Sequence, residues 1–242
     1  RNTHGANTLP QERSQTALPP ILDGRQSAIT VEAAGRSWRL ERAANLEELW
    51  QAMTENTQSF EDERLPYWTE LWPSSMVLAN WLAERRHELA GKPCLDMGCG
   101  LGLTAMAGQW LGARITAMDY EPEALRFAAH NARINQVAQP FWLLMDWRHP
   151  ALQSGCMARI WGGDIMYEKR FVDPVLRFLA HALAPDGVAW VAEPGRSVYE
   201  AFLHALSGFG FQGRRVHSGQ VRVRYDRLVP VTVHIWELTR RP

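Results

Sequence analysis

Between residues 93 and 192 the chain alternates short apolar runs with longer segments in which apolar residues recur every three or four positions. The short runs predict buried strands, and the periodic segments predict helices that pack one face against a sheet. A helix that begins at Pro73, with Leu78 and Trp81 on one face, precedes this alternation. Strands joined by helices run parallel, so we expect a doubly wound α/β fold.

The predicted elements have definite bounds along the chain. Strands are expected over residues 93–97, 114–118, 141–145, 158–161 and 188–192, and helices over residues 101–111, 122–134 and 197–206. One more helix is expected after Asp173, as its N-cap, and Pro174, with Leu183 on its apolar face. Residues 184–187 are expected to form a turn.

The two ends of the chain follow other patterns. After residue 214, two or three β segments occur without a helix between them, which predicts an antiparallel edge. Near the N-terminus we expect a hairpin and a helix over residues 45–50 capped by Asn45. The chain is therefore divided into a flexible tail over residues 1–27, a small α/β appendage over residues 28–65 and a main domain over residues 66–242.

Composition narrows the classes of protein. The 242 residues carry 26 basic and 26 acidic side chains, so the formal net charge is zero, which disfavours a general nucleic-acid or anionic-membrane binder. No apolar run approaches the ~20 residues of a membrane span. The three cysteines, Cys94, Cys99 and Cys156, match neither a disulfide framework nor a zinc pattern, so we expect a reducing cytoplasm.

A glycine-rich stretch lies where the strand over residues 93–97 turns into a helix. Glycines stand at positions 98, 100 and 102, and Asp96 lies two residues before the first of them, in the pattern D-x-G-x-G-x-G. Glycines let a ligand approach the backbone closely, and a helix N-terminus offers N–H groups to a negative charge. A dinucleotide site would need glycine at position 103, which is Leu103, so a diphosphate ligand is disfavoured.

Two further acids end the next predicted strands. Asp119 follows the strand over residues 114–118, and a carboxylate there can hold both hydroxyls of a ribose. Asp146 ends the following strand and precedes Trp147, a pair suited to accept from an adenine amine and to pack beside the ring. The structural alternatives are that Asp119 begins a turn and that Asp146 is a cap beside a core tryptophan.

Three acids ending three successive strands, the first in D-x-G-x-G-x-G, resemble the class I S-adenosylmethionine-dependent methyltransferases, over roughly residues 66–239. The segment over residues 184–187 is also typical of that fold. The resemblance implies a Rossmann-like, mostly parallel sheet of seven strands with an antiparallel C-terminal edge. It also implies an enzyme that uses S-adenosyl-L-methionine as its cofactor.

Several segments narrow the resemblance to the family-16 protein-lysine methyltransferases. Residues 66–73 and 78–82 resemble the part that precedes the glycine motif in that family. Residues 144–147 resemble its acid–tryptophan pair, and residues 162–167 resemble its D-x-x-Y signature. Residues 193–197 resemble the D-P-G-R-like segment of relatives that act on the electron-transfer flavoprotein β subunit, although Glu stands first where those relatives tend to have Asp. A protein lysine is therefore the expected acceptor.

The motifs and the resemblance together predict two groups of site residues and no metal ligand. The cofactor-binding group is Trp72, Asp96, Gly98, Cys99, Gly100, Gly102, Asp119, Tyr120, Asp146, Trp147 and Gly163, and the catalytic group is Asp164 and Tyr167. An indole face beside a sulfonium stabilises positive charge by roughly 0.5–2 kcal/mol, which is the role expected of Trp72.

A lysine amine must be neutral to attack a methyl group. With a reference pKa near 10.4, losing the proton at pH 7 costs about 4.6 kcal/mol, and an apolar pocket lowers that cost. A carboxylate has the opposite effect, so Asp164 is expected to bind and aim the amine and to stabilise the charge growing on it. Tyr167 is expected to wall the pocket. Alternatively, Asp164 is a cap and Tyr167 a packed aromatic side chain.

Two other functions fit the same motifs. A small-molecule N- or O-methyltransferase would share the cofactor site, and a non-catalytic partner subunit would bind the cofactor and transfer nothing. Nucleic-acid methylation is disfavoured because residues 163–167 lack the N/D-P-P-Y segment of amino-adenine enzymes. We therefore expect a protein partner, with a small molecule as the alternative, no nucleic acid and no membrane. The chain is expected to act as a monomer or weak dimer.

Overall fold

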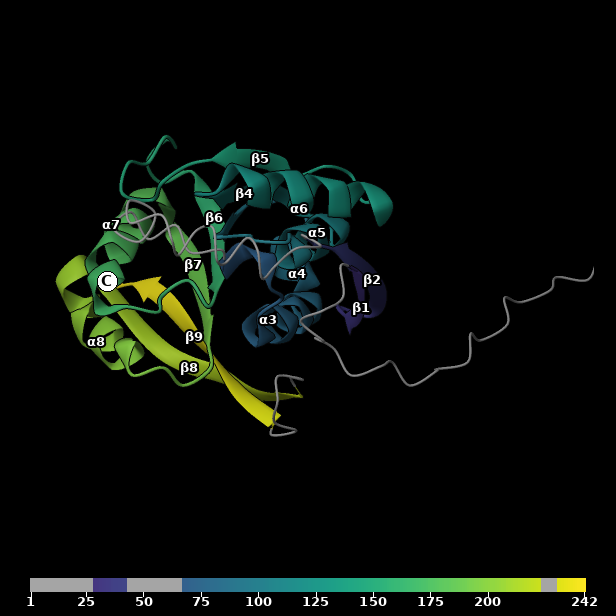
Figure 1. The fold of residues 1–242 in the computed structure, drawn as a ribbon. Helices are drawn as coiled ribbons and strands as arrows, with labels where there is room; N and C mark the ends of the chain where they lie inside the picture. Colours follow the sequence, from purple (N-terminus) through teal and green to yellow (C-terminus); the bar gives the residue numbers. More distant parts are fainter. Residues whose placement is uncertain (1–27, 43–66, 223–229) are drawn as a thin grey trace, which may run out of the picture.

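The computed structural model describes residues 28–42, 67–222 and 230–242, and in it a seven-stranded sheet forms the centre of the molecule (Figure 1). Its strands are β3 (Pro93–Met97), β4 (Arg114–Asp119), β5 (Phe141–Leu144), β6 (Met157–Gly163), β7 (Leu183–Glu193), β8 (Phe211–Arg222) and β9 (Pro230–Arg240). The spatial order is β5-β4-β3-β6-β7-β9-β8. In this order, the neighbours among β5, β4, β3, β6 and β7 pair in parallel, whereas β9 is antiparallel to β7 and to β8. The predicted mixed sheet with an antiparallel C-terminal edge is confirmed.

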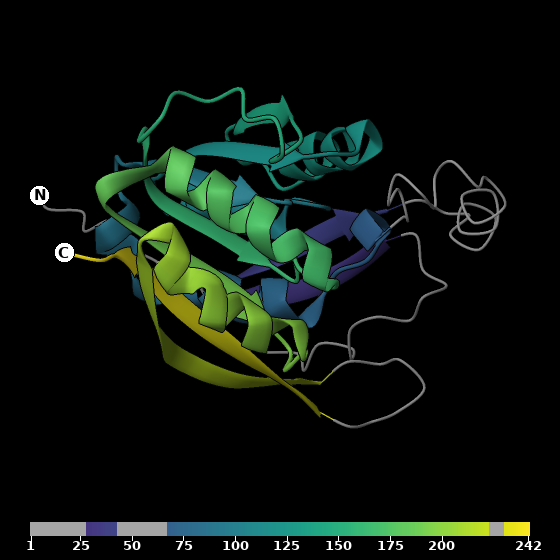
Figure 2. The same ribbon diagram turned by 90° about the vertical axis from the view of Figure 1, so that its left-hand side faces the viewer.

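Helices cover both faces of this sheet (Figures 1 and 2). The longer ones are α3 (Pro73–Glu84), α5 (Leu103–Trp110), α6 (Pro122–Ile134), α7 (Val172–Ala182) and α8 (Val198–Ala205). The shorter ones are η1 (Tyr67–Thr69), α4 (Arg86–Leu89), η2 (Lys169–Phe171) and η3 (Leu206–Phe209). Within the described ranges, none of these helices has the length and apolar character that crossing a bilayer requires.

Alternate side chains of the central strands enter two separate cores. Leu95 and Met97 of β3 lie in a cluster with the apolar faces of α7 and α8. Cys94 of the same strand lies in a second cluster with α3 and α5, which also holds Trp161 of β6. Because both faces of the sheet are covered, its central strands are apolar at nearly every position, which is why they were visible as short continuous runs in the sequence.

The predicted N-terminal hairpin is present as β1 (Ala28–Ala33) and β2 (Arg36–Glu41), which form a separate two-stranded sheet. Asn131 of α6 and Asn135 at the C-cap of that helix attach the hairpin to the main body. Asn131 accepts from the backbone N–H of Glu41 at 2.8 Å, and Asn135 accepts from that of Arg39 at 2.9 Å. The tail over residues 1–27 and the predicted helix over residues 45–50 lie outside the described residues, and the division into a tail, an appendage and a main domain stays a prediction.

Two expectations about α7 were wrong. The helix begins at Val172 after η2, with Phe171 at the N-cap, so Asp173 lies in the first turn and is not the cap. Leu183, expected on the helix, is instead the first residue of β7 and pairs with Met157. The helical spacing of Leu183 was therefore coincidental, because a buried strand start also requires an apolar residue.

The segment over residues 184–187 was also expected to be a turn, but it lies within β7. Its pairing is irregular: Met157 pairs with Leu183, and Arg159 already pairs with Val188. Four residues of β7 thus stand opposite one residue of β6 and bulge out of the ladder. A proline among them has no N–H to donate to a neighbouring strand, which favours such an interruption.

Candidate functional site

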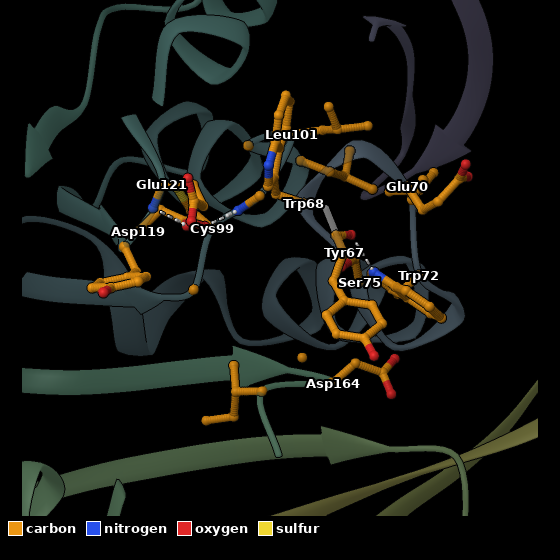
Figure 3. A pocket seen from close by; sticks show the side chains of 18 of the residues that line it. Tyr67, Trp68, Glu70, Trp72, Ser75, Cys99, Leu101, Asp119, Glu121 and Asp164 are labelled. Atoms are coloured by element: carbon orange, nitrogen blue, oxygen red, sulfur yellow. Dashed lines mark hydrogen bonds between the residues drawn. The ribbon is translucent and has the colours of Figure 1, made fainter. Parts of the chain in front are cut away.

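An open cleft lies at the carboxyl ends of β3, β4 and β6, with about 900 Å³ of free space, part of it continuous with solvent (Figure 3). Clefts at this edge of an α/β sheet are common ligand sites. Among the predicted site residues, those that line it are Trp72, Gly98, Cys99, Gly100, Gly102, Asp119, Tyr120, Trp147, Gly163, Asp164 and Tyr167. The structure thus brings together residues from both predicted groups in one cleft.

The glycine turn between β3 and α5 forms one wall. Gly98, Gly100 and Gly102 have φ angles of 72°, 50° and 88°, in the left-handed region that favours glycine. A Cβ at Gly102 would lie 2.9 Å from the Cβ of Ala128, and one at Gly98 would lie 3.1 Å from Ile165 Cγ2. These contacts explain why Gly98 and Gly102 cannot carry ordinary side chains. The left-handed φ of Gly102, the N-cap, explains why α5 begins at Leu103, two residues later than predicted.

The amides of this turn point at β4. Gly98 and Cys99 donate to the Met118 carbonyl at 3.0 and 2.9 Å, and Gly100 donates to Asp119 Oδ2 at 2.9 Å. The expectation that N–H groups at this turn face a negatively charged ligand therefore fails for these three amides. A diphosphate needs such donors, so this geometry strengthens the preference for another ligand class.

Asp119 ends β4 and is 9% exposed. Its Oδ1 accepts from the Glu121 N–H at 3.0 Å, and its Oδ2 accepts from Gly100. Burial raises the pKa of this carboxyl, and the backbone N–H groups of Glu121, Gly100 and Tyr120 offset part of that rise. A carboxylate offers about four acceptor positions, so the hydrogen bonds from Gly100 and Glu121 leave room for ribose hydroxyls. The residues at this end of the cleft thus fit an adenosyl group.

The other two strand-end acids lie outside the lining of the cleft. Asp96 is 1% exposed and accepts from Thr104 Oγ1 at 2.7 Å, so it ties the glycine turn to α5. Burial raises the pKa of Asp96 to about 7. Asp146 pairs with Arg148 at 2.8 Å. Burial would raise the pKa of Asp146, but the hydrogen bonds and charge of Arg148 hold it below its usual range.

Asp164 lies at the end of the cleft away from Asp119, after β6, and its φ is 54° (Figure 3). Its N–H donates to the Ala192 carbonyl at 3.0 Å, and its side chain is 3% exposed. Arg196 approaches Oδ1 at 3.4 Å, whereas Oδ2 is buried without a hydrogen-bond partner among the described residues. Burial raises the pKa of Asp164, and the neighbouring Ser74 and the positive charge of Arg196 offset part of that rise.

Aromatic rings stand beside this carboxyl. The Tyr67 ring lies 4.6 Å from the Tyr167 ring and 6.1 Å from the Trp72 ring. Trp72 Nε1 donates to the Tyr67 carbonyl at 2.8 Å, and Figure 3 shows both side chains beside Asp164. Tyr167 in turn contacts Phe171, with ring centroids 4.9 Å apart. This end of the cleft thus combines an acid with a largely apolar surround.

The cysteines and possible metal ligands add no further chemistry to the cleft. Cys94, Cys99 and Cys156 are unpaired, and Cys99 lines the cleft from a buried position. Burial raises the pKa of the Cys99 thiol well above its ordinary value, which keeps it in the unreactive protonated form. In the parts of the chain that the structure describes, no three His, Cys, Asp or Glu side chains are grouped to hold a metal ion.

Some lining or adjoining residues were not predicted as site residues. Tyr67 and Ile165 line the cleft, and Arg196 contacts Asp164. All three lie inside segments that carried the family resemblance, and this was the available signal. Trp68, in the first of these segments, is buried and packs on Phe127 with ring centroids 5.7 Å apart.

The sequence of the chain is similar to those of known methyltransferases. Residues 75–159 match the model of the ribosomal protein L11 methyltransferase (PrmA) family. The electron transfer flavoprotein beta subunit lysine methyltransferase of Danio rerio is 30% identical over 151 residues, which cover 60% of this chain and 58% of that protein. The ribosomal protein L11 methyltransferase of Hahella chejuensis is 33% identical over 148 residues, 61% of this chain and 43% of that protein. The chain spans about half the length of the curated relatives it matches.

Solved structures agree with the fold. The ribosomal protein L11 methylase of Lactobacillus delbrueckii subsp. bulgaricus superposes with a TM-score of 0.55 at 19% identity, over 72% of this chain and 81% of that one. The 16S rRNA N2 G1207 methyltransferase of T. thermophilus, solved in complex with AdoMet and guanosine, gives 0.58 at 13% identity, over 88% of this chain and 50% of that one.

These findings confirm the resemblance, the fold and the cofactor predicted from the sequence. The family model, the two curated relatives and the two solved structures named above all carry methyltransferase or methylase names. The chain has the Rossmann-like fold of class I S-adenosylmethionine-dependent methyltransferases, it resembles the electron transfer flavoprotein β subunit lysine methyltransferases, and the cofactor that this resemblance assigns to it is S-adenosyl-L-methionine.

Proposed function

We propose that this chain transfers a methyl group from S-adenosyl-L-methionine to the side-chain amine of a lysine in a protein. One observation carries the proposal. The Asp164 carboxyl is buried with an unpartnered oxygen, among aromatic rings, in the cleft whose other end has the glycine turn and Asp119. An amine nucleophile needs an acceptor for its N–H and a dry surround, and these are the two properties of this end.

At the cofactor end, S-adenosyl-L-methionine supplies, when bound, a methyl group that its sulfonium sulfur activates. In this proposal Asp119 holds the ribose hydroxyls, Trp147 packs beside the adenine and Trp72 presents its indole face to the sulfonium. Asp96 acts indirectly, because its hydrogen bond to Thr104 keeps the glycine turn in place. Asp146, outside the lining, is the least supported member of the predicted group.

At the acceptor end, Asp164 accepts a hydrogen bond from the amine and so aims its lone pair. Desolvation between the Tyr67 and Tyr167 side chains disfavours the ammonium form, and the same rings exclude water. The carboxylate then stabilises the positive charge that grows on nitrogen during attack. Since alignment is the main requirement, this arrangement contributes through proximity and orientation and needs no strong general base.

The names of the relatives favour a protein acceptor. Electron transfer flavoprotein beta subunit lysine methyltransferases act, by name, on a lysine of a protein, and the L11 methyltransferases act on a ribosomal protein. We accordingly place a protein, and not a nucleic acid, at the acceptor end. The proposal further has the chain act in a reducing cytoplasm, in keeping with its unpaired cysteines, as a monomer or weak dimer.

A labelling experiment tests the acceptor class. Lysate from cells that lack the protein is incubated with the purified chain and S-adenosyl-L-methionine labelled on its methyl group. Label is expected in a discrete protein band, and mass spectrometry is expected to place it on lysine. Label in the small-molecule fraction would instead favour a metabolite methyltransferase, and binding of S-adenosylhomocysteine without any transfer would favour a non-catalytic partner subunit.

The matched control is Asp164→Asn, which keeps the size of the side chain and removes its charge. This variant is expected to bind S-adenosylhomocysteine like the wild type in calorimetry and to leave the lysate unlabelled. Equal labelling by both proteins would contradict the role of Asp164, whereas weaker binding of the homocysteine product would show that the cleft itself had changed.

A further inference from the structure

The loop between β7 and α8 carries a cationic side chain to the acceptor carboxylate. Glu193, at the end of β7, is 2% exposed and accepts from the backbone N–H groups of Gly195 and Arg196 and from Trp236 Nε1. Three donors on one buried carboxylate fix the path of this loop. The hydrogen bond to Glu193 thus fixes the backbone of Arg196, and with it the position from which the arginine side chain extends.

From this fixed backbone position, the Arg196 guanidinium reaches Asp164. Its Nε and Nη2 both lie 3.4 Å from Oδ1 of Asp164, and its Cζ lies 6.0 Å from the centre of the Trp72 ring. The arginine side chain is 36% exposed, while that of Asp164 is 3% exposed. The guanidinium therefore covers the acid from the solvent side, next to the ring assigned to the sulfonium.

The two oxygens of Asp164 differ as a result. Oδ1 faces both guanidinium nitrogens, whereas Oδ2 is buried and has no hydrogen-bond partner among the residues described. The Ser74 hydroxyl, from the first turn of α3, is also buried. It lies near enough to Asp164 to lower the pKa of that carboxyl, but it makes no normal hydrogen bond with it or with another described residue. An orphan carboxylate oxygen in a buried place is costly unless a ligand donates to it.

We propose that Arg196 is a positioning residue for the acceptor amine: it occupies Oδ1 of Asp164, leaves Oδ2 to accept from the amine, and offsets part of the negative charge of the carboxylate. This inference rests on the proposed function. A bare carboxylate would hold the substrate as ammonium, which cannot attack a methyl group. A carboxylate already paired with guanidinium still accepts a hydrogen bond, but it favours the ammonium far less.

Other groups face this pair from the surrounding elements. Tyr67 comes from η1, Tyr167 and Glu168 come from the segment after β6, Glu193 from β7 and Tyr199 from α8. Burial raises the pKa of Tyr67 and of Tyr199, so neither phenol loses its proton near neutral pH. Changes in the pH profile near neutrality on altering Arg196 therefore report on the Asp164 carboxylate and the amine that it binds.

The test compares Arg196→Met with Arg196→Lys, which retains the charge, and with Arg214→Gln as the control. Arg214 is an exposed arginine of β8 paired with Glu237, remote from the cleft lining. For Arg196→Met we expect kcat to fall at least about tenfold at pH 7 and the acid limb of the kcat profile, which reports the bound amine, to move up by about one pH unit, the shift typical of one nearby charge. Arg196→Lys is expected to restore the position of that limb, and Arg214→Gln to behave as wild type.

A second measurement does not depend on the acceptor. The Asp164 carboxyl is titrated by ¹³C NMR, assigned with Asp164→Asn, in the wild type and in Arg196→Met. Losing the guanidinium should raise the Asp164 pKa by about one unit. An unchanged titration, or an unchanged pH profile in an active Arg196→Met protein, overturns the assignment. If the wild type methylates no protein lysine, the proposed function fails, and the titration alone decides whether Arg196 offsets the charge of Asp164.

Discussion

The two ends of the cleft each hold a buried acid, but the structure builds them differently. Asp119 has both oxygens occupied by backbone N–H groups of residues within 19 positions along the chain. Asp164 has one oxygen with no hydrogen-bond partner among the described residues, and its other oxygen faces a side chain 32 positions away. Backbone donors hold the first acid in place whatever the surrounding side chains are, whereas the second depends on a single arginine and on aromatic neighbours.

This contrast indicates a preformed cofactor end and an acceptor end that awaits a donor. The glycine turn and Asp119 lock one another, so little must change when a ribose arrives. At the other end, the backbone of Asp164 has a φ of 54°, a sparsely populated conformation for a residue other than glycine, and its side chain carries the oxygen that has no partner among the described residues. Strain and unsatisfied polar atoms are common at functional sites, and here they support the proposed acceptor end.

The largest effect is expected from Asp164→Asn, which breaks the acceptor end and spares the cofactor end. We expect kcat to fall by at least about 100-fold, as for other groups that stabilise developing charge. Affinity for S-adenosylhomocysteine should stay within about twofold, because Asp119 and the glycine turn are untouched. Steady-state kinetics and calorimetry measure both. Asp173→Asn, in the first turn of α7, serves as control and should leave both values unchanged.

The next largest effect tests the preformed turn. Gly102→Ala places a Cβ 2.9 Å from that of Ala128 at a φ of 88°, so the free energy of unfolding should fall by about 2 kcal/mol, with loss of cofactor binding. Urea unfolding measures the change. Gly210→Ala, at a φ of 78° with no atom within 4 Å, isolates the cost of the backbone angle alone. Equal losses in the two variants would argue against a tight contact between the turn and α6.

A smaller effect separates the strand-end acids. Asp119→Ala should weaken S-adenosylmethionine binding at least about tenfold, the worth of a hydrogen bond to a charged group. Asp146→Ala should weaken it less than about threefold, because Asp146 lies outside the lining and pairs with Arg148. Calorimetry decides. A large loss in the Asp146 variant would restore the adenine contact that the sequence suggested for it, and no loss in the Asp119 variant would remove the ribose role.

The last effect is one on stability as a function of pH and concerns Asp96, whose pKa burial raises to about 7, against about 3.9 in an unfolded chain. Between these values the native state holds a proton that the unfolded state has lost. Stability therefore falls as pH rises from about 4 to 7, by at most about 1.4 kcal/mol per pH unit, and is level above 7.

Asp96→Asn should abolish this fall, which urea unfolding at pH 5, 6 and 7 measures. Asp146→Asn provides the opposite case: the pKa of Asp146 is lowered, so its contribution is present above the unfolded value and is lost only as the pH drops below it. That variant should therefore show the wild-type slope between pH 5 and 7. A wild-type slope in Asp96→Asn would show that this carboxyl does not hold its proton in the native state.

Local patterns predicted most of the central sheet. The bounds of β3 and of α6 match the predicted ranges in full, since an apolar run and an amphipathic helix between clear breakers leave little freedom. The start of α7 and the run over residues 184–187 were misjudged. Both segments contain a proline, which fits a turn, a helix start or an interrupted strand. Only the pairing of β7 with β6, and the position of η2 directly before α7, decide between these structures.

The candidate site divides in the same way. Its glycines and Asp119 were visible because a strand, a turn and a helix are consecutive in the sequence. Arg196 was not predicted as a site residue. It follows β7, whereas its partner Asp164 follows β6, and no local spacing in the sequence links the two. Asp96 was placed in the cleft by its motif, whereas the structure shows it beneath the turn with Thr104.

The sequence by itself determined the order of strands and helices, the glycine turn and the acids at the strand ends, because these depend on periodicity and on backbone angles that neighbouring residues impose. Only the tertiary structure decided which side chains share the cleft and which oxygen of Asp164 is left without a donor. That decision rests on side chains brought together by the sheet from distant parts of the chain, and burial, which sets the cost of each unpaired group, exists only once the chain has folded.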